Sequence, residues 1–258
     1  MIALAFGGGT DSTAILGAWV ERELQKVTPI DVIVFADTGG ERPHTYEHIS
    51  RTSEWCVQNG LPEIQIVTKG GRQETLEENC LRMKMLPSLA YGYKGCSHKF
   101  KIAPQEKFFN NNSQARNVWK AGGKVVKLIG YEFREERRWA KAKLEDDKYL
   151  YRFPLVEWEW SRPECIAAIN RMGIPLPGKS SCFFCPASTK PEIDQLKTQY
   201  PVLFQRALSL EDNAKENLTS VKGLGRRFSW RDYATTSEVP DVIPCMSCND
   251  GDGCDIKT

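Results

Sequence analysis

The sequence lacks any apolar stretch that approaches the length of a membrane span, and Met1 begins almost directly on a short apolar run. It also lacks a strong charge of either sign, because the net charge is +2 and the pI is about 8.0. A charge this small does not by itself demand a nucleic acid partner. We therefore expect a cytoplasmic protein without membrane contact, with one main core over its 258 residues.

Cysteine is not scarce, since the chain has nine. Disulfides are unexpected in a reducing compartment. The spacings Cys182-x-x-Cys185 and Cys245-x-x-Cys248 indicate metal or redox chemistry instead.

A glycine-rich segment, residues 6–13, follows the apolar run 2–5 and leads into an apolar helical pattern. Glycines let a ligand approach the main chain, and the first N–H groups of a helix lack internal acceptors. The segment therefore predicts a site for the phosphates of a nucleotide such as ATP, with Asp11 as a ligand for Mg²⁺ or an orienting group. A glycine turn without a ligand is the alternative. The candidate binding residues are Gly7, Gly8, Gly9, Asp11, Ser12 and Thr13.

The two commonest phosphate loops do not match this segment. No lysine follows the glycines, which excludes the kinase-type P-loop. Counting from Gly7, the sixth position is Ser12, where the dinucleotide fingerprint requires glycine.

The apolar pattern predicts a doubly wound, mostly parallel α/β fold. We expect strands at 2–5, 31–36, 64–67 and 124–129, and helices at 13–26, 43–59, 104–120 and 164–172. The stretch 173–178 is rich in proline and glycine, so we place a boundary there. Residues 1–178 then form the nucleotide-binding domain, and 179–258 form a smaller helical, cysteine-containing region with a helix at 191–210.

A second polar segment follows the strand 31–36, and it contains Asp37, Thr38 and Gly39. Open α/β sheets bind ligands at the carboxyl ends of their strands, so these residues are further candidates for the nucleotide site. A helix N-terminus with a preceding turn explains the same residues. His44 and His48 lie one helical turn apart, and we interpret them as helix-surface residues.

These segments resemble a known family. Residues 7–12 resemble the Ser-Gly-Gly-x-Asp-Ser loop of the ATP pyrophosphatases (PP-loop enzymes) of the adenine nucleotide alpha-hydrolase superfamily, with Gly7 in place of serine. Residues 37–45 are similar to the same segment of the phosphoadenosine phosphosulfate (PAPS) reductase branch. The resemblance implies an adenine nucleotide site that spans both segments.

Two further segments resemble that family. Residues 127–138 resemble its strand-Gly-x-Arg segment, which implies phosphate contacts by Arg137 or Arg138, and a surface salt-bridge network is the alternative. Residues 95–104 resemble its Cys-Cys-x-x-Arg-Lys-Val-x-Pro segment, with Ser97 in place of the second cysteine. Lys99 and Lys101 in this segment are candidate catalytic residues.

The resemblance also implies a metal site. Cys96, Cys182 and Cys185 are predicted to hold a 4Fe-4S cluster whose fourth iron is open, and a structural Zn²⁺ site is the alternative. The C-terminal cysteines could add a ligand, form a second site or remain a flexible reduced tail. These are Cys245, Cys248 and Cys254.

The implied function is ATP-dependent sulfur transfer, in which an acceptor is adenylated, pyrophosphate is released and the acceptor is thiolated. The expected partners are a nucleic acid acceptor, contacted by Lys99, Lys101 and residues 226–231, and a sulfur-donor protein. PAPS or adenosine phosphosulfate reduction is an alternative, although Cys254 is not followed by the Gly-Leu-His of the reductases. A non-catalytic nucleotide- or nucleic-acid-binding protein held together by zinc is the second alternative.

Overall fold

The protein contains one parallel β-sheet. Its structure, a computed structural model, describes residues 1–71 and 74–236. The strands lie in the order β3-β2-β1-β4-β5, and every neighbouring pair is parallel. This arrangement confirms the predicted parallel α/β fold. The strands are β1 (Ile2–Phe6), β2 (Val32–Asp37), β3 (Ile64–Thr68), β4 (Val125–Ile129) and β5 (Tyr149–Arg152).

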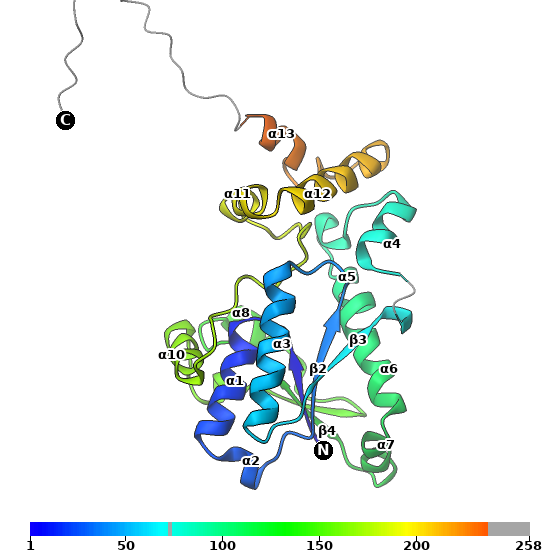
Figure 1. Cartoon of the computed structure of the whole chain (residues 1–258). Helices are drawn as coiled ribbons and strands as arrows, with labels where there is room; N and C mark the ends of the chain where they lie inside the picture. The colour runs from blue at the N-terminus through cyan, green and yellow to red at the C-terminus, as the bar shows by residue number, and fades with distance from the viewer. Residues whose placement is uncertain (72–73, 237–258) are drawn as a thin grey trace, which may run out of the picture.

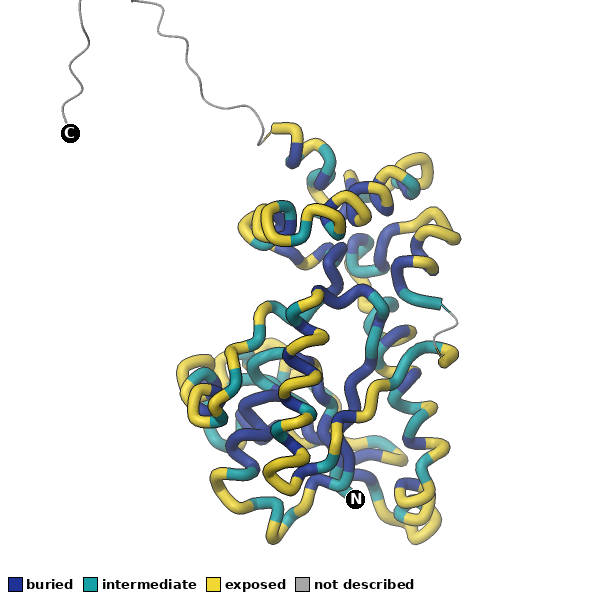
Figure 2. Tube along the Cα trace, in the orientation of Figure 1, coloured by how far each residue is buried: buried dark blue, intermediate teal, exposed yellow. Residues whose placement is uncertain are grey.

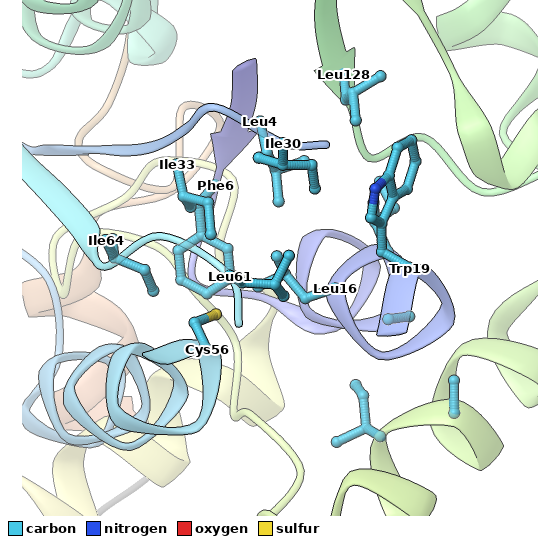
Figure 3. Packing of buried hydrophobic residues seen from close by; sticks show 14 of the residues in the cluster. Leu4, Phe6, Leu16, Trp19, Ile30, Ile33, Cys56, Leu61, Ile64 and Leu128 are labelled. Atoms are coloured by element: carbon cyan, nitrogen blue, oxygen red, sulfur yellow. The ribbon is translucent and has the colours of Figure 1, made fainter. Parts of the chain in front are cut away.

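Helices cover both faces of the sheet (Figure 1). On one face lie α1 (Thr10–Glu21) and α3 (Pro43–Gln58), and α10 (Arg162–Met172) packs against α1. On the other face lie α6 (Ala103–Asn111) and α7 (Ser113–Lys120). Successive side chains of each strand point to opposite faces of the sheet. In Figure 3, Leu4 and Phe6 of β1 lie near Leu16 of α1, whereas Ala3 belongs to the core under α6 and α7.

The direction of strand addition reverses at β1. From β1 the chain continues to β2 and β3 on one side, and it then returns to add β4 and β5 on the other side. The connections after β1 and β4 therefore leave the sheet in different directions, and a crevice opens between their carboxyl ends.

A helical layer lies beyond the carboxyl end of β2 (Figure 1). It consists of α4 (Leu76–Met83), α11 (Lys190–Gln199), α12 (Pro201–Ala214) and α13 (Trp230–Thr236). Its core contains Phe184 and Trp230 together with Phe100, which comes from the middle of the chain. Figure 2 shows this second buried core above the sheet. The domain boundary at residue 178 stays a prediction, but residues 76–100 share a core with the segments beyond it.

Some elements differ from expectation. The helix expected at 191–210 is interrupted at Tyr200, because the residue before Pro201 avoids the helical region and adopts φ −135°. The helix expected at 104–120 is divided at Asn112, whose side chain caps α7 by accepting the Ala115 N–H at 2.9 Å. The sequence analysis did not include β5 or α4.

Short elements complete the described chain. They are α2 (Leu24–Val27), η1 (Lys69–Gly71), η2 (Ser88–Tyr91), α5 (Gly95–Ser97), η3 (His98–Ile102), α8 (Glu136–Trp139), α9 (Pro154–Glu157) and η4 (Lys215–Asn217). Among the helices of the described residues, none has the length and apolar character needed to cross a membrane.

Candidate functional site: a pocket at the strand-order reversal

A cavity of about 380 Å³ occupies the crevice between the ends of β1 and β4. We call it the switch-point pocket. The β1 side contributes Gly7, Gly9, Thr10, Asp11 and Ser12, and the β4 side contributes Ile129, Gly130 and Tyr131. Arg138, Arg162, Gly178, Lys179 and Ser180 complete most of the wall.

Hydrogen bonds within the glycine loop fix its shape. The Ser12 hydroxyl accepts the Gly7 N–H at 3.1 Å and donates to the Gly9 carbonyl at 3.3 Å. The Thr13 hydroxyl donates to the same carbonyl at 2.8 Å. Since Gly9 is the N-cap of α1, the N–H groups of Thr10, Asp11 and Ser12 have no acceptor within the helix and lie at the pocket wall. These N–H groups and the helix dipole favour an anion there.

Two glycines allow this close packing. Gly8 has a φ of 68°, in the left-handed region that glycine adopts most readily. A Cβ on Gly130 would lie 2.9 Å from the Ser12 nitrogen and 3.0 Å from the Asp11 Cβ. Gly130 therefore lets the end of β4 lie directly against the first turn of α1.

Three basic side chains line the same pocket: Arg138, Arg162 and Lys179. Arg162 Nη1 lies 3.1 Å from Asp11 Oδ1, and the Arg138 guanidinium lies 4.6 Å from the centre of the Tyr131 ring. Guanidinium groups bind phosphate oxygens through paired hydrogen bonds. The pocket thus combines cations and backbone donors around a volume suited to a polyphosphate.

The Asp11 carboxyl is perturbed by its surroundings. Burial raises its pKa, the Arg162 guanidinium opposes that rise, and the carboxylates of Glu135 and Glu132 add to it. A bound cation would relieve the same repulsion, because carboxylate oxygens are the ligands that Mg²⁺ prefers. The role of Asp11 as a magnesium ligand stays a prediction.

The pocket contains most, but not all, of the predicted loop residues. Arg138 lines it, whereas Arg137 is exposed and is not among its lining residues. Gly8 and Thr13 are also not among them. The sequence did not indicate three further lining residues, which are Arg162, Lys179 and Ser180. Of these, Ser180 contacts the glycine loop directly, because its hydroxyl donates a hydrogen bond to the Gly7 carbonyl.

The two histidines of α3 correct one expectation. We expected helix-surface residues, but His48 is only 5% exposed, and its Nε2 lies 2.9 Å from Thr13 Oγ1. Burial lowers the pKa of His48 to about 4. His44 is partly buried, with Nδ1 3.2 Å from the Tyr200 hydroxyl. His48 thus stabilises the glycine loop through Thr13, because the Thr13 hydroxyl also donates a hydrogen bond to the Gly9 carbonyl.

The segment after β2 turns toward the cysteines. The Asp37 carboxylate accepts the Gly39 N–H at 2.8 Å and the Tyr46 hydroxyl at 2.9 Å. Thr38 Oγ1 lies 3.1 Å from Cys182 Sγ. None of Asp37, Thr38 and Gly39 is among the lining residues of the switch-point pocket, so adenine binding by this segment stays a prediction.

Cys96, Cys182 and Cys185 form what we call the thiol region. Cys182 belongs to the core of the helical layer, and Cys96 and Cys185 are partly buried and pack against that core. Burial raises the pKa of Cys182 and of Cys185, and the charge of Cys96 adds to the rise for Cys185. The Lys101 ammonium opposes it at both thiols and lies 3.3 Å from the buried Glu41 carboxylate.

Lys99 lies between Cys96 and Lys101 in the chain. Its ammonium donates to Asn79 Oδ1 at 3.2 Å and lies 5.7 Å from the centre of the Phe100 ring. The described contacts of Lys99 and Lys101 are thus with protein groups outside the switch-point pocket, and their catalytic roles stay predictions.

The arrangement of potential metal ligands bears on the cluster and zinc hypotheses. Within residues 1–71 and 74–236, no group of three or more His, Cys, Asp or Glu side chains is placed to hold a metal ion. Cys245, Cys248 and Cys254 lie outside the described residues. The thiol region by itself therefore does not fit a cluster or zinc in this conformation, and both hypotheses stay predictions.

No protein-family model matches the chain, and no curated protein matches it. Among solved structures, the chain is similar to a phosphoadenylyl-sulfate (PAPS) reductase from Candida auris in a phosphate complex. The identity is 18%, the TM-score is 0.43, and 68% of this chain and 74% of that chain are covered. It is also similar to the U34-tRNA thiolase NcsA from Methanococcus maripaludis with its 4Fe-4S cluster. There the identity is 16%, the TM-score is 0.41, and the coverage is 93% of this chain and 82% of that chain.

Proposed function

We propose that this chain is a PP-loop ATP pyrophosphatase, an enzyme that transfers the adenylyl group of ATP to an acceptor and releases pyrophosphate. The observation that carries the proposal is the switch-point pocket, which is lined both by Arg138, Arg162 and Lys179 and by the first turn of α1. The motif resemblance of residues 7–12 supports the choice of ATP over other anions.

The residues of the pocket have distinct parts in this reaction. The acceptor oxygen attacks the α-phosphorus, and the bond from that phosphorus to the bridging oxygen of pyrophosphate breaks. The leaving pyrophosphate takes the electron pair, so negative charge grows on its oxygens, where the N–H groups of α1 and the two arginines stabilise it. Bound Mg²⁺ would supply further charge neutralisation, and Asp11 is the residue that would hold it.

We further propose that the activated acceptor receives sulfur. Hydrosulfide delivered by a donor protein attacks the adenylated carbon and forms the carbon–sulfur bond. The carbon–oxygen bond breaks, AMP leaves with the acceptor oxygen, and the proton on sulfur passes to solvent. Cys182 and Cys185 follow Lys179 and Ser180 of the pocket wall by only a few residues, which supports a link between the two regions. We assign no step to an iron–sulfur cluster, because the described residues do not form a metal site.

Two arginines of α10 provide a matched test. Arg162 begins the helix at the pocket, whereas Arg171 lies in its last turn and pairs with Glu21 at 2.6 Å. We expect Arg162→Ala to weaken ATP binding, measured by isothermal titration calorimetry, about tenfold or more, and to reduce pyrophosphate release in proportion. Arg171→Ala should behave as the wild type.

The same measurements separate the alternatives. If Arg162→Ala and the wild type bind ATP with equal affinity, the proposal that ATP binds in the switch-point pocket is contradicted. ATP binding without release of pyrophosphate, in the presence of a range of acceptors, would instead favour the non-catalytic nucleotide-binding alternative.

A further inference from the structure

The segment from residue 218 to 229, which we call the basic loop, presents three exposed cations. These are Lys222, Arg226 and Arg227. Within the described part of the chain, none of them has a carboxylate within 4.0 Å. The nearby Arg231, in contrast, pairs with Asp212. Unpaired cations so close together repel one another, which leaves this surface suited to an anionic partner.

The basic loop is held in a defined conformation by one buried carboxylate. Glu211 of α12 is 4% exposed, and it accepts the Leu224 N–H at 2.6 Å and the Trp230 N–H at 2.9 Å. It also accepts the Ser229 hydroxyl at 2.6 Å. These bonds to one buried charge hold the middle and the C-terminal end of the loop, so Arg226 and Arg227 lie between two fixed points rather than on a freely moving chain.

Arg226 is held in an unusual backbone conformation. Its φ is 64°, which is uncommon for any residue except glycine. Its Nε donates to the Ala90 carbonyl at 3.3 Å, which anchors the loop to η2. Backbone strain of this kind persists where the surrounding structure holds it, and it gathers at ligand-binding sites.

Aromatic rings lie beside these cations. A cavity of about 600 Å³ is lined by Tyr91 and Phe228 together with Arg226 and Arg227. The Tyr91 ring stacks on the Tyr93 ring, with centroids 6.4 Å apart and planes at 28°. Tyr93 is 54% exposed, so much of this residue is accessible to a ligand.

The surface continues toward the thiol region. Tyr93 also lines a neighbouring cavity of about 250 Å³, which contains Cys96, Lys99 and Asn79. Thus the stacked tyrosines join two cavities, one edged by arginines and the other by a thiol. A chain of phosphates and flat rings bound along this path would reach Cys96.

We propose that the basic loop and the stacked tyrosines bind single-stranded nucleic acid. Arg226 and Arg227 contact successive phosphates, and a base stacks on Tyr93. Alternating phosphates and bases match the alternation of cations and aromatic faces, which an acidic peptide would not do. The identification of this strand as the acceptor rests on the proposed function, whereas the binding itself does not.

Fluorescence anisotropy with a labelled single-stranded RNA of about 12 nucleotides tests the proposal, and the DNA of the same sequence serves as a second probe. We expect Arg226→Ala/Arg227→Ala to weaken binding about tenfold or more. The slope of log K against log salt should fall in magnitude by about 1.4, since each phosphate contact to a single strand contributes about 0.7. Tyr93→Ala should weaken binding about fivefold or more without changing the slope.

Controls separate this surface from general charge effects. Arg116→Ala/Lys120→Ala removes two exposed cations from α7, on the far side of the molecule, and should leave binding unchanged. If the arginine pair of the basic loop affects folding, Arg227→Glu provides a second variant, because Arg227 is exposed and outside any described ion pair. Circular dichroism and the melting temperature report the folding of each variant.

The outcomes are distinct from those for the ATP reaction. Absence of RNA and DNA binding by the wild type, or equal losses in the basic-loop and α7 variants, would overturn the proposal. Wild-type ATP binding is measured in parallel, so failure of the nucleotide site is seen separately. If RNA binding depends on Arg227 but the wild type does not bind ATP, the proposed nucleic acid surface is supported and the proposed adenylating activity is contradicted.

Discussion

The switch-point pocket and the thiol region lie at neighbouring strand ends but are built in different ways. The glycine loop of the pocket is one continuous segment, residues 7–12, which closes on itself through Ser12, and the other side of the pocket comes from β4 and later segments. The thiol region draws Cys96 from the middle of the chain and Cys182 and Cys185 from beyond residue 178. A local motif thus shapes the anion-binding loop of the first, whereas all parts of the second come together only by long-range packing. We therefore expect the two regions to respond differently to the same kind of mutation.

The largest expected effect concerns the core of the helical layer. Phe184 is fully buried, and its ring lies against Gly40 of the segment after β2. Phe184→Ala should lower the free energy of unfolding by about 3–5 kcal/mol, measured by urea denaturation, because it leaves a cavity. ATP binding by the folded protein should persist, since the pocket does not depend on this ring. Loss of ATP affinity in folded Phe184→Ala would show that the regions are coupled.

An intermediate effect is expected at the pocket itself. Gly130→Ala would place a Cβ 2.9 Å from the Ser12 nitrogen, so the strand end and α1 must separate. We expect ATP binding to weaken about tenfold or more, through about 1–3 kcal/mol of overpacking. Gly60→Ala is the control, because a Cβ there meets nothing within 4 Å. Its φ of 74° should cost stability but not ATP affinity. The account fails here if both variants bind ATP as the wild type does.

The third expected effect is a pH dependence of stability, which is confined to pH values below about 6.5. The pKa of His48 falls from its usual 6.5 to about 4 in the folded protein, because burial disfavours the charged ring. The unfolded chain therefore takes up a proton first as the pH falls below 6.5. The stabilising contribution is present above pH 6.5 and is lost as the pH falls through about 4.

Equilibrium unfolding between pH 7 and 4 measures this effect. In His48→Gln the loss of stability between pH 7 and 4 should be smaller than in the wild type by about 3 kcal/mol, since each unit of pKa shift corresponds to about 1.4 kcal/mol. His98→Gln, at an exposed histidine, serves as the control and should keep the wild-type dependence. Identical pH profiles for His48→Gln and the wild type would contradict the assignment of a neutral, buried His48.

Much of the sheet could be predicted from the sequence, because β1 is apolar throughout, β2 is apolar up to Asp37, and β4 is apolar apart from Lys127. By contrast, β5 has only four residues with alternating exposure, which gives a weak signal. Similarly, α4 is short and acidic, although the capping box of Thr75 and Glu78 marks its start.

The site could be predicted only in part, for a related reason. The glycine loop is local, so its residues could be identified from spacing alone. Arg162 and Lys179 reach the pocket only after α10 packs on α1, and no short motif records that contact. The capping box of Ser161 and Glu164 could have placed Arg162 at a helix start, but not beside Asp11.

The most direct test of the central claim is a crystal structure with an ATP analogue that carries a methylene group between its α- and β-phosphorus atoms. We expect its β- and γ-phosphates to lie in the switch-point pocket. Their oxygens should be about 3 Å from Arg162, Lys179 and the N–H groups of residues 10–12. Phosphates bound elsewhere, with this pocket empty at saturating analogue, would contradict the account.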